Sequence, residues 1–225
     1  MLKQVAARLP DRWQTGLKRI HFRRQINKGT FLTDEPEYSI LHNFISPGDW
    51  VIDIGANVGH YTKRFSELVG AQGRVIAFEP VPTTFSLLSA NVELFAHSNV
   101  SLINAAVSDK LDVAGISMPK FSTGLTNYYE ARLSSSSESV LTVLTLSVDS
   151  LGINQAVSLV KIDVEGHESF VLAGMQRLIE KHHPVLIVET DSEELITKLT
   201  SMDYVSEKLP GSPNILFKPG KLRSK

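Results

Sequence analysis

The stretch VIDIGANVGHYT, residues 51–62, decides how this chain is expected to fold. Its first four residues read as a buried strand, because three of them are apolar and β-branched and only Asp53 is polar. Gly55 and Gly59 then allow positive φ angles and let the backbone come close to another molecule. A helical pattern begins directly afterwards. The stretch therefore predicts a strand, a ligand-binding turn and a helix in immediate succession.

Similar strands and helices alternate along most of the rest of the chain. The expected strands are residues 50–53, 74–78, 100–104, 158–163, 185–189, 204–208 and 214–218. The expected helices are residues 59–69, 83–95, 168–181 and 193–201. This alternation predicts a mostly parallel sheet with helices on both faces. The closing strand pair, joined by the turn at 210–213, predicts an antiparallel edge.

The length of 225 residues suits one domain with a substantial core. We expect a helical basic arm over residues 1–27 and a single domain over residues 28–225. The alternation is interrupted at about 111–148, where two strand-like pieces, 113–118 and 140–148, flank a polar stretch. We interpret this segment as an insertion into the domain.

The composition excludes several classes of protein. The chain has no cysteine, which excludes disulfides, cysteine-ligated zinc, iron–sulfur clusters and a thiol nucleophile. Its N-terminus lacks the apolar core of a signal peptide, and no run approaches the roughly 18 apolar residues of a membrane span. We therefore expect a cytoplasmic protein without a transmembrane segment.

Charge is distributed unevenly along the chain. Residues 1–24 contain seven basic residues and one acidic residue, so this arm is strongly positive although the whole chain has a net charge of −1. The acidic remainder suits a cationic ligand better than a nucleic acid, and we expect no nucleic-acid partner. The arm could contact a membrane surface, a polyanion or a partner protein, or it could be a solvated amphipathic helix. The sequence pattern carries no signal for an oligomeric state.

Polar side chains gather at the carboxyl ends of the expected strands. They are Asp53, Glu79, Asn104, Asp163 and Glu189. In open α/β sheets, ligands bind outside the carboxyl ends of the strands, where the strand order reverses. We therefore expect these residues to share one site.

The first turn favours a nucleoside over a dinucleotide. Asn57 stands where a bound pyrophosphate would require a second glycine, so an NAD-dependent oxidoreductase is disfavoured. Glu79, at the end of the next strand, is placed to accept hydrogen bonds from both ribose hydroxyls of a nucleoside.

Five motifs in order resemble those of a known family: DIGANVGHYT, VIAFEPVP, NAAVSD, LVKIDVEGHE followed by VLAGM, and PVLIVE. They resemble the FkbM family of S-adenosylmethionine-dependent methyltransferases, over about residues 28–218. The resemblance implies the Rossmann-like class I methyltransferase fold, with a mostly parallel seven-stranded sheet, an antiparallel edge and helices on both faces. It also implies S-adenosyl-L-methionine as cofactor and methyl transfer, usually to an oxygen of a small or glycosidic metabolite. One departure is Ser147-Val148-Asp149, where family members often carry Thr-Leu-Asp.

The resemblance further implies which residues bind the cofactor. Those expected at its nucleoside and amino acid parts are Asp53, Gly55, Asn57 and Glu79. Those expected near the adenine are Asn104 and Ala105 or Ala106, with Asp109 as a weaker candidate.

The stretch LVKIDVEGHESF concentrates the candidate catalytic residues at a strand end and the start of a helix. Methyl transfer to an alcohol depends on positioning, and the acceptor also loses a proton, so a nearby base helps. His167 is our first choice for that base, because it titrates near neutrality and a helix N-terminus lowers its pKa. Asp163 is expected to position cofactor or acceptor, and Glu165 is the next candidate for catalysis. Alternatively, Glu165 and Glu168 cap the helix and His167 is an exposed residue of its first turn.

Two other interpretations stay open. Asp163, Glu189 and Asp191 could together bind Mg²⁺, but no compact ligand motif occurs, and we expect no metal. A non-catalytic protein that keeps the cofactor pocket is the alternative to an enzyme. We expect a hydroxylated small-molecule acceptor, with sugars among the candidates, selected by residues 21–45 and 119–139. In the second segment, Tyr128 and Tyr129 could form an aromatic wall over the acceptor or a packed surface pair.

Overall fold

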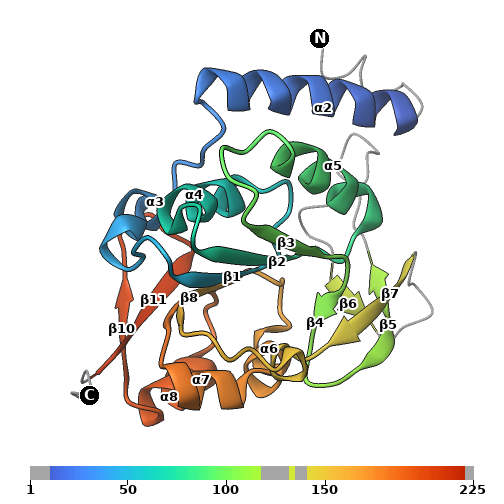
Figure 1. Cartoon of the computed structure of the whole chain (residues 1–225). Coiled ribbons are helices and arrows are strands. Elements are labelled where there is room, and N and C mark those ends of the chain that lie inside the picture. Colours follow the sequence, from blue (N-terminus) through green and yellow to red (C-terminus); the bar gives the residue numbers. More distant parts are fainter. Residues whose placement is uncertain (1–10, 118–131, 135–140, 221–225) are drawn as a thin grey trace.

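The computed structural model describes residues 11–117, 132–134 and 141–220. Its centre is a seven-stranded sheet with the order β10-β11-β9-β8-β1-β2-β3 (Figure 1). The strands are β1 (Trp50–Ile54), β2 (Arg74–Phe78), β3 (Val100–Ile103), β8 (Val157–Ile162), β9 (Val185–Glu189), β10 (Tyr204–Lys208) and β11 (Asn214–Pro219). Neighbouring strands from β3 to β9 pair in parallel, and β11 is antiparallel to both β9 and β10. The predicted mostly parallel sheet with an antiparallel edge is confirmed.

The strand order reverses between β1 and β8. The chain places β2 and β3 on one side of β1 and then returns to place β8 on the other side. Ile54 of β1 lies opposite Phe78 of β2 and Ile162 of β8, and Ile162 lies opposite Val188 of β9. The four strands therefore end level with one another, and the residues at their ends meet at one edge of the sheet.

Helices cover both faces of this sheet. They are α2 (Asp11–Lys28), α3 (Pro36–Ile40), α4 (His60–Val69), α5 (Pro82–Val92), α6 (Glu168–Ala173), α7 (Gln176–His182) and α8 (Glu193–Ser201), with the 3₁₀ helices η1 (Leu41–Asn43) and η3 (Val148–Leu151). Ile52 and Ile54 of β1 face a core formed with α6, α7 and α8, whereas Val51 faces α4 and η1. This alternation follows from the two-residue period of a strand. No helix among the described residues is long and apolar enough to cross a bilayer.

The helix expected over residues 168–181 is instead two helices, α6 and α7. Gly174 lies between them, and a Cβ atom there would come within 1.9 Å of the carbonyl oxygen of Ser108. The Asp149 carboxylate accepts hydrogen bonds from two backbone N–H groups in the first turn of α7, at 2.9 and 3.0 Å. The single-helix prediction was wrong because tight packing at Gly174 and this capping carboxylate start a new helix.

The segment expected as an insertion contributes strands to a second, smaller sheet. Its strands are β4 (Ala106–Val107), β5 (Asp112–Ser117), β6 (Arg132–Ser134) and β7 (Leu141–Leu146), in the order β4-β7-β5-β6. Ile116 and Val143 of this sheet pack with Val81, which follows β2. The second sheet thus forms a wall beside the carboxyl end of β2. Tyr128, Tyr129 and most of residues 119–139 lie outside the described residues.

Candidate active site

A cavity of about 240 Å³ lies at the reversal of strand order, at the carboxyl ends of β1, β2, β8 and β9. The predicted site residues that line it are Gly55, Asn57, Glu79, Ala105, Ala106, Asp163, Glu165 and His167. Asp53 and Asn104 are not among the lining residues. The arrangement brings together residues more than 100 positions apart in the chain, because the parallel strands end level.

At Gly55, the loop after β1 contacts the loop after β8, and these two loops form the floor of the cavity. Its φ angle is +82°, and a Cβ atom on it would lie 1.8 Å from the carbonyl oxygen of Asp163. The backbone N–H of Asp163 donates to the carbonyl of Ile54 at 3.0 Å. Only glycine meets both requirements, a left-handed backbone and direct contact with the loop after β8.

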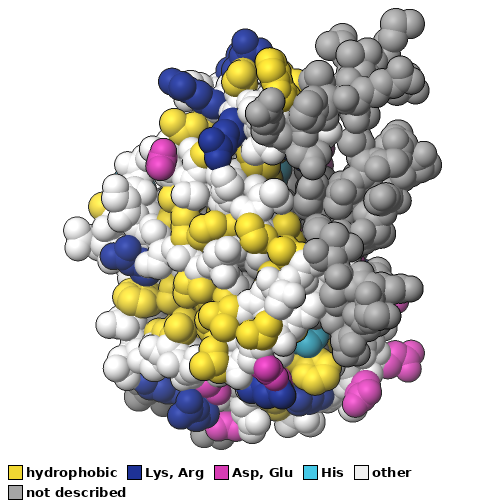
Figure 2. Space-filling model, turned by 90° about the vertical axis from the view of Figure 1, so that its right-hand side faces the viewer, with side chains coloured by type: hydrophobic (Ala, Val, Ile, Leu, Met, Phe, Trp, Pro, Cys, Tyr) yellow, Lys and Arg dark blue, Asp and Glu magenta, His cyan; other side chains and the backbone are white. Residues whose placement is uncertain are grey.

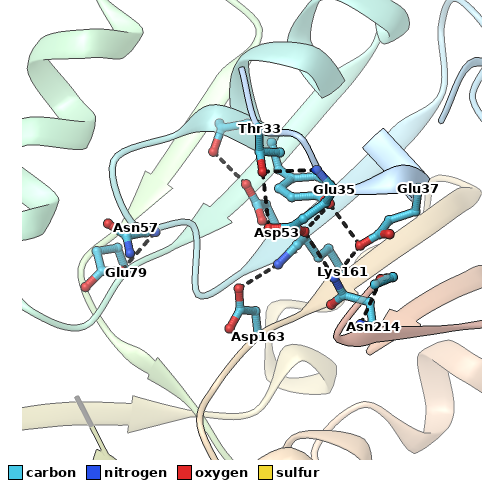
Figure 3. Close-up of polar contacts among 12 residues, drawn as sticks. Thr33, Glu35, Glu37, Asp53, Asn57, Glu79, Lys161, Asp163 and Asn214 are labelled. Carbon is cyan, nitrogen blue, oxygen red and sulfur yellow. Dashed lines mark hydrogen bonds and ion pairs between the residues drawn. The ribbon is translucent and has the colours of Figure 1, made fainter. Parts of the chain in front are cut away.

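Glu79 presents a fixed carboxylate to the cavity. It accepts hydrogen bonds from the backbone N–H groups of Asn57, at 3.0 Å (Figure 3), and of Val81, at 2.9 Å. Burial raises the pKa of Glu79 to about 7, although the two N–H donors act in the opposite direction. The Asn104 side chain donates to the carbonyls of Glu79 and Pro80 at 2.8 and 3.1 Å, so it holds this turn from outside the cavity.

Asp53 lies beneath the cavity floor. Asp53 comes two residues after Val51 in β1, so its side chain also points to the α4 face, where its Oδ2 accepts from the Thr62 hydroxyl at 2.6 Å. Its Oδ1 is buried and has no hydrogen-bond partner among the described residues. Burial raises the pKa of Asp53 to about 6, and the nearby Lys161 opposes that rise.

Lys161 is a buried charged residue beside the cavity that sequence reasoning left without a role. It lies opposite Asp53 across β1 and β8, only 2% exposed, and its ammonium group donates to Asp163 Oδ2 at 2.7 Å (Figure 3). The same group lies 4.6 Å from the centre of the Tyr61 ring. Burial lowers the pKa of Lys161, but the carboxylates of Asp163 and Asp53 outweigh this effect and raise it. A lysine inside the apolar run LVKID was the available signal.

Two glutamates from the segment before β1 complete the polar network behind the cavity. The Tyr61 hydroxyl donates to Glu35 at 2.6 Å and to Glu37 at 3.2 Å. The Asn214 amide donates to Glu35 at 3.1 Å and also to Glu37 (Figure 3). Burial and these carboxylates raise the pKa of Tyr61. Sequence reasoning missed Glu35 and Glu37, because nothing local distinguishes them from solvated acids.

Asp163 and Glu189 form a pair of acids at the wall of the cavity. The pKa of Glu189 is raised to about 7, mainly because the group is partly buried. The negative charge of Asp163 and its hydrogen bond with Glu189 raise this pKa further. Near neutral pH, Glu189 is therefore protonated in part of the molecules and can donate as well as accept a hydrogen bond.

His167 lines the cavity and has a defined partner on one ring nitrogen. Its Nε2 lies 2.9 Å from the Ser108 hydroxyl, which in turn lies 3.1 Å from the Asp109 carboxylate. The ring stacks on Phe170 at 4.6 Å. Burial lowers the pKa of His167, while Asp109 and Glu168 oppose that shift. The direction agrees with the expectation from sequence, but the cause is burial.

A second cavity, of about 580 Å³, adjoins the first and shares Glu165 and Glu189 with it. Its other lining residues are Gly166, Glu168, Ser169, Thr190, Asp191, Ser192, Lys208 and Pro213. Carboxylates and hydroxyls predominate on this surface. Among the described residues, no group of three or more His, Cys, Asp or Glu side chains is arranged to hold a metal ion.

The first cavity fits S-adenosylmethionine. Glu79 presents a carboxyl group that can accept hydrogen bonds from hydroxyls, and the small apolar residues Ala105 and Ala106 also line the cavity. No lysine or arginine occurs among the described residues that line the cavity. The carboxyl groups of Glu79, Asp163 and Glu189 line the cavity and suit a ligand that carries ammonium and sulfonium charges.

Comparison with known proteins agrees with this chemistry. A sequence model of the methyltransferase FkbM domain matches residues 53–206. The chain is 28% identical over 167 residues to the hexuronic acid methyltransferase AglP of Haloferax volcanii, in an alignment covering 72% of this chain and 65% of that protein. The crystal structure of a methyltransferase FkbM from Methylobacillus flagellatus KT matches with a TM-score of 0.56 at 16% identity, covering 80% of this chain and 50% of that one.

A methyltransferase structure from Geobacter sulfurreducens matches with a TM-score of 0.51 at 13% identity and covers 94% of this chain and 91% of that one. These structural matches show the class I methyltransferase fold. The chain spans less than two thirds of the length of AglP and of the Methylobacillus protein. Because the domain model covers more than half of the sequence, this chain belongs to the FkbM family of S-adenosylmethionine-dependent methyltransferases.

Proposed function

We propose that this protein methylates a hydroxyl oxygen of a sugar or a similarly hydroxylated small molecule. The observation that carries the proposal is the junction between the two cavities. The first cavity fits the cofactor, and the second is lined by carboxylates and hydroxyls. Glu165 and Glu189 belong to both, and His167 lies on the first.

S-adenosylmethionine supplies an electrophilic methyl group when it is bound. Glu79 would hold the ribose hydroxyls, and Gly55 would let the backbone approach the ligand closely. Asp163 and Glu189, which both line the cavity, would lie near the positive charges of the amino acid part and the sulfonium. Asn104 acts through the Glu79 turn, which it braces by two hydrogen bonds.

His167 is the proposed general base. Because burial lowers its pKa, it is neutral at pH 7 and can take a proton. Ser108 has one hydroxyl proton. When the hydroxyl donates this proton to Asp109, its oxygen accepts a hydrogen bond from Nε2–H of His167. The other ring nitrogen, Nδ1, then carries the lone pair that can take a proton. The acceptor hydroxyl would give its proton to His167 as its oxygen bonds to the methyl carbon, and the methyl–sulfur bond would break to leave S-adenosylhomocysteine.

The second cavity supports a neutral acceptor rather than an acidic one. Sugar hydroxyls donate well to carboxylates such as Glu165, Glu168 and Asp191, and a uronic acid would be repelled by them. Lys208 is the only Lys or Arg among the described residues lining this cavity. The similarity to a hexuronic acid methyltransferase supports a sugar acceptor, while the acidic lining favours a neutral sugar.

Two measurements test the proposal. Calorimetry with S-adenosylhomocysteine should show binding, and NAD should show none. Glu79→Gln should weaken that binding roughly 10- to 100-fold, because a buried charged acceptor is lost. The matched control Glu93→Gln changes an exposed glutamate and should leave the affinity unchanged. Equal affinities for the two variants would remove Glu79 from the ribose site.

The acceptor class is tested by incubation with S-adenosylmethionine and a panel of neutral glycosides, amino sugars and uronic acids. We expect formation of S-adenosylhomocysteine with neutral glycosides, and NMR should locate the methyl group on an oxygen. Transfer only to uronic acids, or to nitrogen, would contradict the proposed acceptor. A protein that binds the cofactor and methylates none of a broad acceptor panel would favour the non-catalytic alternative.

A further inference from the structure

Helix α2 has two faces that meet different surroundings. On the inner face, Phe22 and Ile26 are only 8% and 9% exposed and pack with Phe31 and Leu87. The Arg19 guanidinium donates to the Ser86 hydroxyl of α5 at 2.6 Å. The helix is therefore fixed on α5, at the top of the molecule in Figure 1.

The outer face carries a stripe that neither the core nor the active site explains. Trp13, Leu17 and Ile20 are spaced by four and three residues, and they are 60%, 49% and 52% exposed. At 100° per residue they lie within an arc of about 60°, opposite the buried Phe22. Large apolar side chains in this pattern normally face a core or a partner.

Cations extend this stripe toward the C-terminal end of the helix. Arg24 and Lys28 continue the same spacing, and both are exposed. We call Trp13, Leu17, Ile20, Arg24 and Lys28 the outer stripe. Residues 12–28 contain no acidic residue. At the top of Figure 2, where α2 lies, dark blue basic side chains stand beside yellow apolar ones.

We propose that the outer stripe of α2 binds the surface of an anionic lipid bilayer. A helix that lies in the plane of a membrane surface buries its apolar residues at the boundary of headgroups and acyl chains, while its Lys and Arg residues contact anionic headgroups. Trp13 has the amphipathic ring that favours this boundary. The stripe supplies all three kinds of contact on one rigid, docked helix.

Other occupants fit the stripe less well. A nucleic acid would use the cations, but Leu17 and Ile20 cannot stack on bases as aromatic residues do. A second copy with its α2 parallel would bring Arg24 and Lys28 against the same cations, and an antiparallel copy would place these cations against the apolar Trp13 and Leu17. Five side chains also fall short of the roughly 800 Å² per partner in a standard stable interface.

Vesicle binding tests the proposal directly on the full chain. The chain has two tryptophans, so Trp50→Phe leaves Trp13 as the single fluorophore. Its emission should shift to shorter wavelength on addition of vesicles containing phosphatidylglycerol, and brominated lipids should quench it. Pure phosphatidylcholine vesicles should bind at least tenfold more weakly, because the cations then have no anionic partner.

The apolar half of the stripe is tested by Leu17→Gln with Ile20→Gln. This pair should weaken binding to anionic vesicles at least tenfold. The matched control replaces Leu111 and Val205, which are 72% and 59% exposed elsewhere, with glutamine and should bind like the parent.

The charged half is tested by Arg24→Gln with Lys28→Gln. Each cation contributes roughly fivefold, so this pair should weaken binding about 25-fold. Lys181→Gln with Lys198→Gln removes two exposed cations of α7 and α8 and is the control. Circular dichroism and S-adenosylhomocysteine binding establish that every variant is folded.

Three results would overturn the proposal. The first is a folded parent protein that does not sediment with anionic vesicles. The second is a protein that binds RNA as well as anionic vesicles, and that loses vesicle binding in the Arg24→Gln, Lys28→Gln variant but keeps it in the Leu17→Gln, Ile20→Gln variant. This result would identify a polyanion site. The third is a dimer without lipid that Leu17→Gln with Ile20→Gln dissociates, which would identify a self-association surface.

Discussion

Replacement of Gly55 by alanine tests whether the loops after β1 and β8 form the cofactor site by direct contact. The new Cβ atom would lie 1.8 Å from the carbonyl oxygen of Asp163, so the loop after β8 would have to move by roughly 1.5 Å to restore ordinary contact. The φ angle of +82° adds about 1–2 kcal/mol for any residue with a Cβ atom. Together we expect a loss of about 3–5 kcal/mol of unfolding free energy.

Gly48→Ala is the matched control. Gly48 also has a positive φ angle, +95°, but a Cβ atom there would meet nothing within 4 Å. It should lose only the backbone contribution of about 1–2 kcal/mol. The difference between the two variants therefore isolates the collision with Asp163.

Urea unfolding and calorimetry with S-adenosylhomocysteine measure the two consequences. We expect Gly55→Ala to bind at least 100-fold more weakly than the parent, because Asp163 and the floor of the cavity are displaced together. Gly48→Ala should bind normally. The reasoning would be refuted by a Gly55→Ala variant as stable as Gly48→Ala that also keeps its affinity for S-adenosylhomocysteine.

Four further predictions concern the charged groups. Glu79 and Glu189 have pKa values of about 7 in the folded chain and about 4.5 in the unfolded chain, so the folded chain binds more protons between these two pH values. The free energy of unfolding, measured in urea, should therefore fall as pH rises from 4.5 to 7. For the same reason, affinity for the cationic S-adenosylmethionine should rise from about pH 6 to about pH 8, and a flat calorimetric profile would contradict this. His167→Ala should reduce kcat roughly 10²- to 10⁴-fold without changing S-adenosylhomocysteine affinity, whereas unchanged turnover would exclude it as the base. Lys161→Met should cost about 3–5 kcal/mol in urea unfolding, because Asp53 and Asp163 lose their buried counter-charge; an exposed control, Lys198→Met, should be neutral.

The glycine turn and the alternation of strands and helices could be predicted because both are local properties. An apolar run of four or five residues followed by glycine identifies β1 and its turn without knowledge of any distant residue. The bounds of β2, β9 and β10 agree with the prediction. Level strand ends then explain why Glu79 and Asp163 line one cavity, as the order of the elements suggested.

The exact roles of neighbouring residues could not be predicted in the same way. Asp53 was expected at a strand end, but β1 continues for one more residue, and the side chain turns toward α4 instead of the cavity. Asn104 also follows a strand, yet its amide binds backbone carbonyls behind Glu79. The face on which a side chain lies follows from the alternation along the strand, which places Asp53 on the same face as Val51.

The amino-acid sequence by itself determined the class of fold, the glycine turn and the set of acids near the strand ends, because periodicity and turn chemistry act between near neighbours in the chain. Only the tertiary structure decided how these acids are partnered. Lys161 meets Asp53 through strand pairing, and Asn214 meets Glu37 across 177 residues. Such contacts leave no local pattern, yet they set the burial and charge that shift the pKa values of the site.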